Sequence, residues 1–309
     1  YFQFLAFMRT FSEVRRLIFL QEGFFMMKHL TDCYTLSNGV KIPCVGFGTW
    51  QAPDGEIAAS SVKAAIEAGY RHIDTAAAYQ NEESVGRGIR ESGVDRKELF
   101  ITTKLWNLVR GYRETIDACH ESMKKLGIDY LDLYLVHWPN PKKYRDHWQE
   151  YNAESWRAFE DLYKAGDIRA IGVSNFRPHH LEELAKTSTV APMVNQIRLC
   201  PGDIMPEVVD YSRSQGMLLE AYSPLGNGKI FQVPEVAQMA EKYHKTVAQL
   251  CLRWSLQMDF LPLPKSVTPS RIVENTQIFD FELAPEDVKI LTELKAEVGG
   301  ASDPDLATF

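Results

Sequence analysis

The sequence predicts an α/β protein that folds as a (β/α)₈ TIM barrel, with an N-terminal β-hairpin closing the barrel bottom. Short apolar runs alternate with amphipathic helical segments eight times, which is typical of a parallel sheet. No Ser/Gly-rich linker divides the chain, and its glycines do not form the G-x-G-x-x-G motif of an open dinucleotide-binding sheet. Asn38-Gly39, between two short apolar runs, predicts the tight turn of the hairpin.

The expected strands follow from these apolar runs. The two hairpin strands are expected at 34–36 and 40–42. The barrel strands are expected at 70–74, 99–105, 131–138, 168–173, 193–197, 218–223, 260–264 and, with a weaker pattern, 278–281.

Helical spacing is clearest in three segments between or after these strands. Thr246 and Gln249 form a capping box before one helix, and Pro285, followed by two acidic residues, suits the first turn of the last helix. Two helix faces consist of apolar residues three and four positions apart: Ala58, Val62, Ala65 and Ile66 in the first, and Val247, Leu250, Cys251 and Trp254 in the second.

The length suits one barrel preceded by an extension. The chain has 309 residues, and residues 1–26 are rich in Phe and Leu but interrupted by charges, so neither a membrane span nor a signal peptide is predicted. We interpret 1–26 as a tag remnant or N-terminal extension, with a helix favoured over 4–20. The alternative is a native membrane or partner helix through which the chain would form an oligomer. Residues 27–309 are expected to form a single barrel domain, monomeric unless 4–26 associate.

The composition narrows the function classes. Formal net charge is −7 without a basic cluster, which argues against a nucleic-acid-binding protein. The five cysteines are widely spaced with no C-x-x-C, so neither a disulfide framework nor a zinc ribbon is indicated, and a cytoplasmic location fits best. Eight histidines include the pair His179-His180 but no H-E-x-x-H, so no metal site is predicted.

Four polar residues are predicted to meet at the carboxyl ends of three adjacent barrel strands, where barrel enzymes place their working groups. Asp74, Lys104 and His137 each close an apolar run, and Tyr79 lies in the loop after Asp74. Each residue alone has an ordinary structural explanation, such as a helix cap, a rim aromatic or a hydrogen-bonded interior histidine. Together, a carboxylate, a phenol, an amine and an imidazole are poorly explained as independent structural features.

The four groups suit proton delivery to a carbonyl oxygen. A free phenol has a pKa near 10, and a neighbouring ammonium lowers it, so Lys104 is expected to lower the pKa of Tyr79. Asp74 would keep the ammonium charged, and His137 would donate a hydrogen bond to the substrate oxygen. The expected reaction is carbonyl reduction, with hydride supplied by a nicotinamide cofactor.

The chain resembles the aldo-keto reductases over residues 33–309, and most closely their short-tailed microbial and protozoan branch. The resemblance rests on ordered motifs: GFGTW (46–50), GYRHIDTAAAYQNE (69–82), TTKLWN (102–107), DLYLVHWP (132–139), IGVSNF (171–176), VNQIRL (194–199), AYSPLG (221–226) and PKSVTPSRIVEN (264–275). It implies that Asp74, Tyr79, Lys104 and His137 are the catalytic tetrad, with Tyr79 as general acid, or as base in alcohol oxidation. Lys104 would be paired with Asp74 and tune Tyr79.

The resemblance also implies a nicotinamide cofactor site. Ser174, Asn175 and Gln196 match positions that hold the nicotinamide carboxamide, and Asp74 is also expected among the cofactor-binding residues. Tyr222 matches the aromatic residue that stacks on the nicotinamide ring. Ser223, Leu225 and Gly226 match the loop along the pyrophosphate.

A further segment matches the adenosine end of the family's cofactor site: Lys265, Ser266, Val267, Thr268, Arg271, Glu274 and Asn275. Its chemistry points the same way, because Lys265 and Arg271 offer positive charge, and Ser266 and Thr268 offer hydroxyl groups, to a 2′-phosphate. NADP(H) is therefore the expected cofactor.

Trp50, Trp106 and Trp138 are expected to line the substrate pocket, with core packing as the alternative. Arg198 and Cys200 occupy positions where the family usually has Glu and His. We expect these two differences to change the local packing or the pocket rim. The segment 302–309 is short beside long-tailed members, which implies a more open site.

Three functions follow in order of preference. The first is NADPH-dependent, reversible reduction of a small aldehyde or ketone, whose identity the sequence does not name. The second is a cofactor-sensing regulatory subunit with the same fold. The third is a barrel lyase that uses Lys104 as a Schiff-base nucleophile, against which Tyr79 and the 2′-phosphate segment argue.

Overall fold

The structure is a computed structural model that describes residues 27–309. The extension expected over 1–26 and its helix over 4–20 lie outside the described residues, and the domain division at residue 27 stays a prediction. Ten strands are present in the described part: β1 (Cys33–Thr35), β2 (Lys41–Pro43), β3 (Gly46–Gly48), β4 (His72–Asp74), β5 (Phe100–Leu105), β6 (Leu133–Val136), β7 (Ile171–Ser174), β8 (Val194–Arg198), β9 (Leu218–Tyr222) and β10 (Leu261–Leu263).

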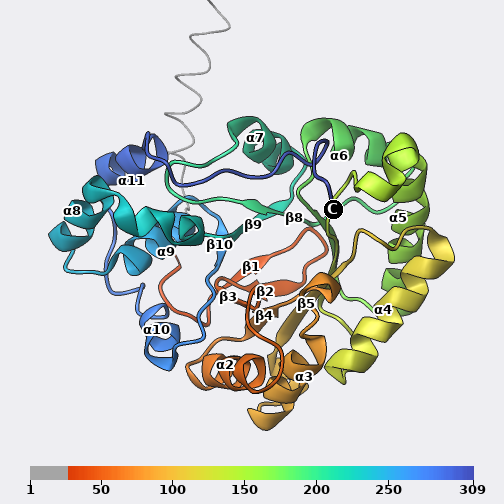
Figure 1. Ribbon diagram of the computed structural model, residues 1–309, viewed down its shortest axis with the longest axis horizontal. Helices are drawn as coiled ribbons and strands as arrows, with labels where there is room; N and C mark the ends of the chain where they lie inside the picture. The colour runs from red at the N-terminus through yellow and green to blue at the C-terminus, as the bar shows by residue number, and fades with distance from the viewer. Residues whose placement is uncertain (1–26) are drawn as a thin grey trace, which may run out of the picture.

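Strands β3 to β10 form one parallel sheet in chain order, and the sheet curls into a barrel. The two edge strands meet where the amide of Gly48 donates a hydrogen bond to the carbonyl of Pro264, at 2.9 Å. Every strand after β3 is reached through helical segments that pack outside the sheet (Figure 1). The predicted (β/α)₈ barrel is therefore confirmed.

The helices surround this sheet. In chain order they are α2 (Glu56–Glu67), α3 (Glu82–Glu91), α4 (Tyr112–Leu126), α5 (Trp148–Ala165), α6 (Pro178–Ala185), α7 (Pro206–Ser214), α8 (Pro234–Lys242), α9 (Val247–Gln257), α10 (Pro269–Glu274) and α11 (Pro285–Thr292), with short 3₁₀ turns η1 (Ala77–Tyr79), η2 (Arg96–Glu98), η3 (Lys142–His147) and η4 (Gly226–Gln232). The capping box at Thr246 and Gln249 and the helix start at Pro285 are confirmed.

The expected set of barrel strands missed one strand and included one that is absent. The first strand is β3, and 278–281 forms no strand. A Cβ at residue 46 would lie 2.6 Å from the His72 ring and 2.5 Å from the Leu263 side chain, and one at residue 48 would lie 3.2 Å from the Leu263 carbonyl. Glycine is needed for this close approach, and a strand of two glycines and one Phe carries little of the apolar signal by which strands are recognised.

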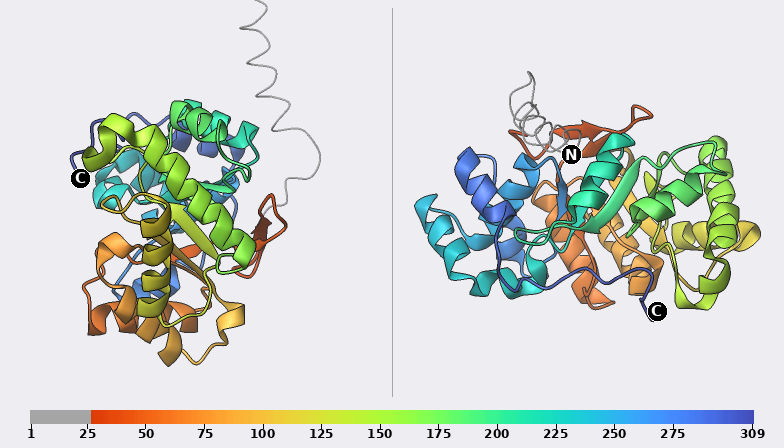
Figure 2. Two further views of the ribbon diagram at one scale, coloured as in Figure 1. Left: turned by 90° about the vertical axis from the view of Figure 1, so that its right-hand side faces the viewer. Right: turned by 90° about the horizontal axis from the view of Figure 1, so that it is seen from above.

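The predicted hairpin is present, with its strands displaced by one residue from the expected positions. Strands β1 and β2 pair antiparallel with Tyr34 opposite Ile42. The Asn38 amide donates to the carbonyl of Arg169, two residues before β7, at 2.9 Å. The hairpin therefore lies at the amino ends of the strands, and Figure 2 shows it opposite the C-terminal segment.

Side chains alternate between the barrel interior and the layer beneath the helices, as the strand period requires. On β4, Ile73 packs in the outer apolar layer, whereas His72 contacts Thr102 and Asp74 contacts Lys104 inside the barrel. Charged and polar side chains consequently fill much of the interior, and the carboxyl ends of the strands present them to one face.

The cysteines and the helices of the described residues bear on the predictions about disulfides and membrane spans. All five cysteines are free, and Cys33 alone among them is exposed. Within residues 27–309, no helix combines the length and the apolar character that crossing a bilayer needs.

Candidate active site

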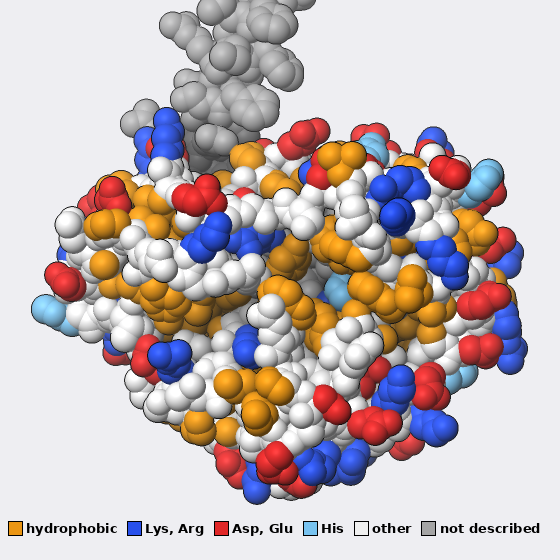
Figure 3. All heavy atoms as spheres, in the orientation of Figure 1, with side chains coloured by type: hydrophobic (Ala, Val, Ile, Leu, Met, Phe, Trp, Pro, Cys, Tyr) orange, Lys and Arg blue, Asp and Glu red, His pale blue; other side chains and the backbone are white. Residues whose placement is uncertain are grey.

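A cleft of about 810 Å³ opens at the carboxyl ends of the barrel strands. This is within the range of roughly 300–1,000 Å³ typical of small-molecule sites. Figure 3 views this end and shows a hollow near the centre, flanked by hydrophobic side chains. Asp74, Tyr79 and His137 line the cleft, and Lys104 lies fully buried beside Asp74 and Tyr79. The structure thus brings together the four residues predicted to be catalytic.

Lys104 is the centre of this group. Its Nζ donates to Asp74 Oδ1 at 2.7 Å, to Asp74 Oδ2 at 2.9 Å and to the carbonyl of Thr75 at 2.9 Å. It also lies 3.4 Å from the Tyr79 hydroxyl. Because β4 and β5 are paired neighbours, their carboxyl ends hold the amine and the carboxylate side by side. The ammonium therefore has a counter-ion and a fixed direction toward the phenol.

The pKa values of this group differ in one respect from the sequence-based expectation. Burial alone would lower the pKa of Lys104, but the charges of Asp74 and of Tyr79 outweigh it and the net pKa is raised. Burial raises the pKa of Tyr79 by more than the Lys104 ammonium lowers it. The Lys104 ammonium lowers the pKa of Tyr79 as expected, but the net pKa is raised because burial disfavours a phenolate by more. Tyr79 is protonated at neutral pH, as a proton donor must be.

His137 is a neutral imidazole. Burial, and then the charges of Lys104 and Arg110, hold its pKa well below the ordinary value. Its ring lies edge-on to Tyr79, with centroids 5.9 Å apart, and to Trp106, with centroids 5.5 Å apart. A neutral ring carries one N–H, so His137 can donate a hydrogen bond to a carbonyl oxygen beside Tyr79 without adding charge.

The residues expected at the nicotinamide end form a hydrogen-bonded group along the same cleft. Tyr222 donates its hydroxyl proton to Asn175 Oδ1 at 2.8 Å, and Asn175 donates to the carbonyl of His137 at 3.0 Å. Ser174 donates to the backbone carbonyl of Gln196 at 2.8 Å, and Gln196 Nε2 donates to Asp74 Oδ2 at 2.9 Å. This bonding fixes the Tyr222 ring, as a stacking platform requires, and links the predicted cofactor site to the tetrad.

The adenosine-end segment reaches the same cleft only in part. Lys265, Ser266, Arg271, Glu274 and Asn275 line it, as do Ser223 and Leu225 of the loop after β9. Three predicted cofactor residues do not line the cleft: Gly226, Val267 and Thr268.

The loop from 265 to 271 nevertheless has a defined shape. Ser266 Oγ accepts the amide N–H of Thr268 at 3.1 Å, so Thr268 shapes the loop through its backbone. Lys265 and Arg271 therefore remain as two cations on the cleft wall, on the loop and helix that follow β10. This donor set fits a phosphate group, which needs positive charge and hydrogen-bond donors.

The three predicted pocket tryptophans all line the cleft. Arg110, which sequence reasoning missed, holds two of their loops in place from a buried position. Its guanidinium donates to the carbonyls of Trp106 at 3.0 Å, Val109 at 2.7 Å and Trp138 at 2.6 Å. A lone Arg in a loop after a strand gives no signal of this role in the sequence.

The C-terminal segment adds a wall that was not predicted. Gly300, Ala301, Ser302 and Phe309 line the cleft. The Phe309 ring stacks on Trp106, with centroids 6.5 Å apart, and meets Trp138 edge-on at 4.9 Å. The segment therefore places an aromatic ring beside two of the pocket tryptophans.

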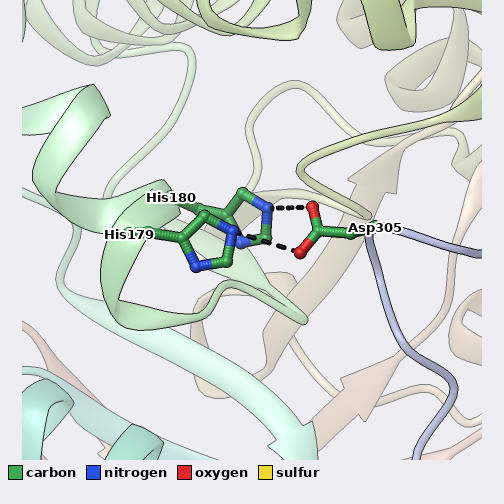
Figure 4. A group of neighbouring side chains, drawn as sticks. All are labelled: His179, His180 and Asp305. Carbon is green, nitrogen blue, oxygen red and sulfur yellow. Dashed lines mark hydrogen bonds and ion pairs between the residues drawn. The ribbon is translucent and has the colours of Figure 1, made fainter.

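Asp305 fastens this segment to the protein. It accepts hydrogen bonds from His180 at 2.9 Å and from Asn140 at 2.9 Å, and His179 lies 3.1 Å from its second oxygen (Figure 4). His180 Nδ1 accepts the backbone N–H of Arg177, so its ring proton is on Nε2 and is donated to Asp305. The His179-His180 pair therefore holds the tail as hydrogen-bond donors.

Two further buried residues were not predicted as site residues. Arg198 lines the cleft and is held by Asp203 and by the carbonyl of Val298, so it joins the loop after β8 to the C-terminal segment. Glu220, within β9, accepts a hydrogen bond from Gln196 at 2.7 Å inside the barrel. Its position inside an apolar run gave no indication of a functional carboxyl group.

Comparison with known proteins agrees with the site. The sequence model of the aldo/keto reductase family matches residues 44–296. The chain is 49% identical to glyoxal reductase of Bacillus subtilis over 92% of this chain and 100% of that protein. It is 41% identical to methylglyoxal reductase DkgA of Escherichia coli, over 87% and 96% of the two chains. Among solved structures, an aldo-keto reductase of Bombyx mori in complex with NADP superposes with a TM-score of 0.77 at 38% identity, covering 85% of this chain and 92% of that one.

Proposed function

Because the chain belongs to the aldo/keto reductase family, we propose that it reduces small carbonyl compounds, dicarbonyls above all, with Tyr79 as the proton donor. The chain is an oxidoreductase that uses NADP(H) to interconvert aldehydes or ketones and alcohols. The observation that carries the residue assignment is the contact of the buried Lys104 ammonium with Asp74 and Tyr79 beside a neutral His137.

When bound, the cofactor supplies a hydride to the carbonyl carbon. The chain's own residues act on the carbonyl oxygen. His137 donates a hydrogen bond that orients this oxygen, and Tyr79 transfers its hydroxyl proton to it as negative charge develops. The Lys104 ammonium, kept charged by Asp74, stabilises the phenolate that remains until Tyr79 regains a proton.

We assign the cofactor site to the residues that share the cleft. Gln196, Asn175 and Ser174 would hold the carboxamide, and Tyr222 would cover one face of the nicotinamide ring. Lys265 and Arg271 would bind the 2′-phosphate, which NADPH has and NADH lacks. Glu274 also lines this part of the cleft, and Thr246 donates to its carboxylate at 2.7 Å, which keeps that negative charge in a fixed place.

The proposed substrates are short dicarbonyls. Trp50, Trp106, Trp138 and Phe309 form apolar walls around the end of the cleft where Tyr79 and His137 lie. A carbonyl carbon beside a second carbonyl is electron-poor and accepts hydride readily. The two curated relatives described above are named for glyoxal and methylglyoxal reduction, which favours the same chemistry here.

The structure bears on the two alternative functions. A Schiff-base lyase needs a neutral lysine, whereas Asp74 and Tyr79 raise the pKa of Lys104 and Asp74 binds its Nζ through both oxygens. A regulatory subunit would need no proton donor poised in the cleft. We keep the cytoplasmic location and the monomeric state as proposals, supported by the five free cysteines and by a proposed tetrad whose four side chains all come from this one chain.

The test is NADPH oxidation by the purified protein with methylglyoxal and glyoxal, followed by absorbance. We expect turnover with both compounds and a much smaller rate with NADH at equal concentration. A lack of turnover with these dicarbonyls and with simple aldehydes and ketones, despite NADPH binding, would instead support the regulatory function.

A further inference from the structure

Glu220 is a buried carboxyl group that the proposed chemistry does not use. It lies in the middle of β9 with 0% of its surface exposed. Its neighbours Leu219 and Ala221 pack in the outer apolar layer, so Glu220 points into the barrel. There it meets the side chains of Gln196 and His72.

A short chain of contacts joins this carboxyl to the catalytic group. Gln196 Nε2 donates one hydrogen bond to Glu220 Oε2 at 2.7 Å and another to Asp74 Oδ2 at 2.9 Å. Asp74 also accepts a hydrogen bond from Lys104 at each of its two carboxylate oxygens. The amide of Gln196 therefore bridges two carboxyl groups, and Gln196 is also a residue to which we assign the nicotinamide carboxamide.

The interior contains one ammonium for these two carboxyl groups. Lys104 donates hydrogen bonds to Asp74, whereas its effect on Glu220 is the electrostatic attraction of a more distant charge. On β4, burial lowers the pKa of His72 to about 3, so it is neutral, and its Nε2 is 3.8 Å from Glu220 Oε1. On β10, the residue in register with Glu220 is the apolar Leu261. No second cation among these neighbours compensates a Glu220 carboxylate.

The surroundings of Glu220 disfavour an ionised carboxylate. Its Oε1 is buried and has no hydrogen-bond partner in the structure, whereas Oε2 accepts a single bond from an uncharged amide. Burial, and then the negative charge of Asp74, raise its pKa to about 8. A carboxyl in this state gains or loses its proton in response to a modest change in local charge.

Cofactor oxidation is such a change, because the nicotinamide ring of NADP⁺ is positively charged and that of NADPH is not. On the basis of the proposed function, we propose that Glu220 is a proton-binding group linked to the cofactor's oxidation state, neutral with NADPH bound and ionised with NADP⁺ bound. Binding of NADP⁺ then releases the Glu220 proton to solvent, and binding of NADPH restores it. By linkage, higher pH strengthens NADP⁺ binding relative to NADPH binding.

The experiment measures binding alone. Dissociation constants for NADP⁺ and NADPH are determined by tryptophan fluorescence between about pH 6 and about pH 9, for the wild-type protein and for Glu220→Gln. The ratio of the two constants removes effects at the adenosine end, which both cofactors share. In the wild type we expect Kd for NADP⁺ divided by Kd for NADPH to fall about three- to tenfold as the pH rises. In Glu220→Gln the ratio stays constant.

Glu82→Gln is the matched control. Glu82 is also a buried carboxyl with a raised pKa, but it bonds to Thr103 and Ser122 in the helix layer and does not line the cleft. We expect this variant to keep the wild-type pH dependence. A flat wild-type ratio, the same slope in Glu220→Gln, or loss of the slope in Glu82→Gln would overturn the proposal.

A measurement on the wild type covers the case in which Glu220→Gln does not fold. In weakly buffered solution at about pH 7, an indicator dye should report proton release when NADP⁺ binds and no proton release when NADPH binds. Equal proton release with both cofactors would contradict the link to Glu220. If neither cofactor binds the wild type, the proposed function itself fails, which is a distinct result.

Discussion

The ammonium of Lys104 is bound by both carboxylate oxygens of Asp74, at 2.7 and 2.9 Å, in the interior of the barrel. Two adjacent parallel strands, β4 and β5, carry the pair. A buried charge without its partner is costly, so the pair fixes both the charge and the direction of the group that faces Tyr79.

Replacement of Asp74 by Asn tests this pair. The variant leaves Lys104 buried beside a neutral amide, and we expect a loss of roughly 3–5 kcal/mol in the free energy of unfolding. Urea denaturation of the wild type and the variant measures it. Asp161→Asn, at an exposed ion pair with Lys164, is the control and should change stability by less than about 1 kcal/mol. Equal effects of the two substitutions would show that the interior pair is not special.

Arg271→Ala tests the assignment of the 2′-phosphate. A charge-assisted hydrogen bond contributes about 1.5–3 kcal/mol, so NADPH should bind roughly ten- to a hundredfold more weakly. NADH affinity should hardly change, because NADH has no 2′-phosphate. Lys289→Ala, an exposed cation on α11, serves as a matched loss of charge and should affect neither cofactor. If Arg271→Ala weakened the binding of NADPH and of NADH equally, Arg271 would contact a part of the cofactor other than the 2′-phosphate.

Phe309→Ala tests the wall that the tail provides. Loss of the ring removes an apolar contact beside Trp106 and Trp138, so KM for methylglyoxal should rise about three- to thirtyfold with NADPH affinity unchanged. Asp305→Ala, which frees the tail from His180 and Asn140, should reproduce part of this rise. Leu306→Ala is the control within the same segment, because Leu306 is 72% exposed. Unchanged KM in both Phe309→Ala and Asp305→Ala would mean that the tail does not shape the substrate site.

The raised pKa of Glu220 also predicts how the stability of the protein without cofactor depends on pH. Its pKa is raised to about 8 in the folded state, while an unfolded chain gives a Glu a pKa of about 4.3. Between these values the folded state retains a proton that the unfolded state releases, so wild-type stability falls as pH rises, by up to about 1.4 kcal/mol per pH unit. Above about pH 8 this contribution levels off.

The stability of Glu220→Gln relative to the wild type should therefore increase from about pH 5 to about pH 8. Urea denaturation at several pH values measures the difference. Glu207→Gln, at an exposed position on α7, gives the reference slope. A difference that does not vary with pH would mean that Glu220 titrates as it does in the unfolded chain.

The rule that barrel enzymes carry their working groups at strand ends was enough to predict Asp74, Lys104 and His137 from the sequence. Each follows a strongly apolar run, so both the strand and its end were recognisable. Strand β3 was missed because the close approach of β10 requires glycines in place of apolar side chains.

Contacts between distant parts of the chain could not be predicted in this way. Arg110 donates to backbone carbonyls of its own loop and of the loop that contains Trp138, and the tail reaches Trp106 because Asp305 meets a histidine on α6. The net pKa of Tyr79 depends on burial, which no local pattern reports. Glu220 lies in an apolar run that gives no sign of a functional carboxyl group. Its proposed role depends on a hydrogen bond from Gln196 on the neighbouring strand β8, a contact that the run itself does not reveal.

The most direct test of the account is Tyr79→Phe, measured for NADPH binding and for methylglyoxal turnover in the same preparation. The substitution removes the hydroxyl that lies 3.4 Å from Lys104 Nζ and leaves the ring in place. We predict that turnover falls by about 10²- to 10⁴-fold while the Kd for NADPH stays within about twofold of the wild type. Wild-type turnover in Tyr79→Phe, or a loss of NADPH binding as large as the loss of turnover, would contradict the assignment of Tyr79 as the proton donor.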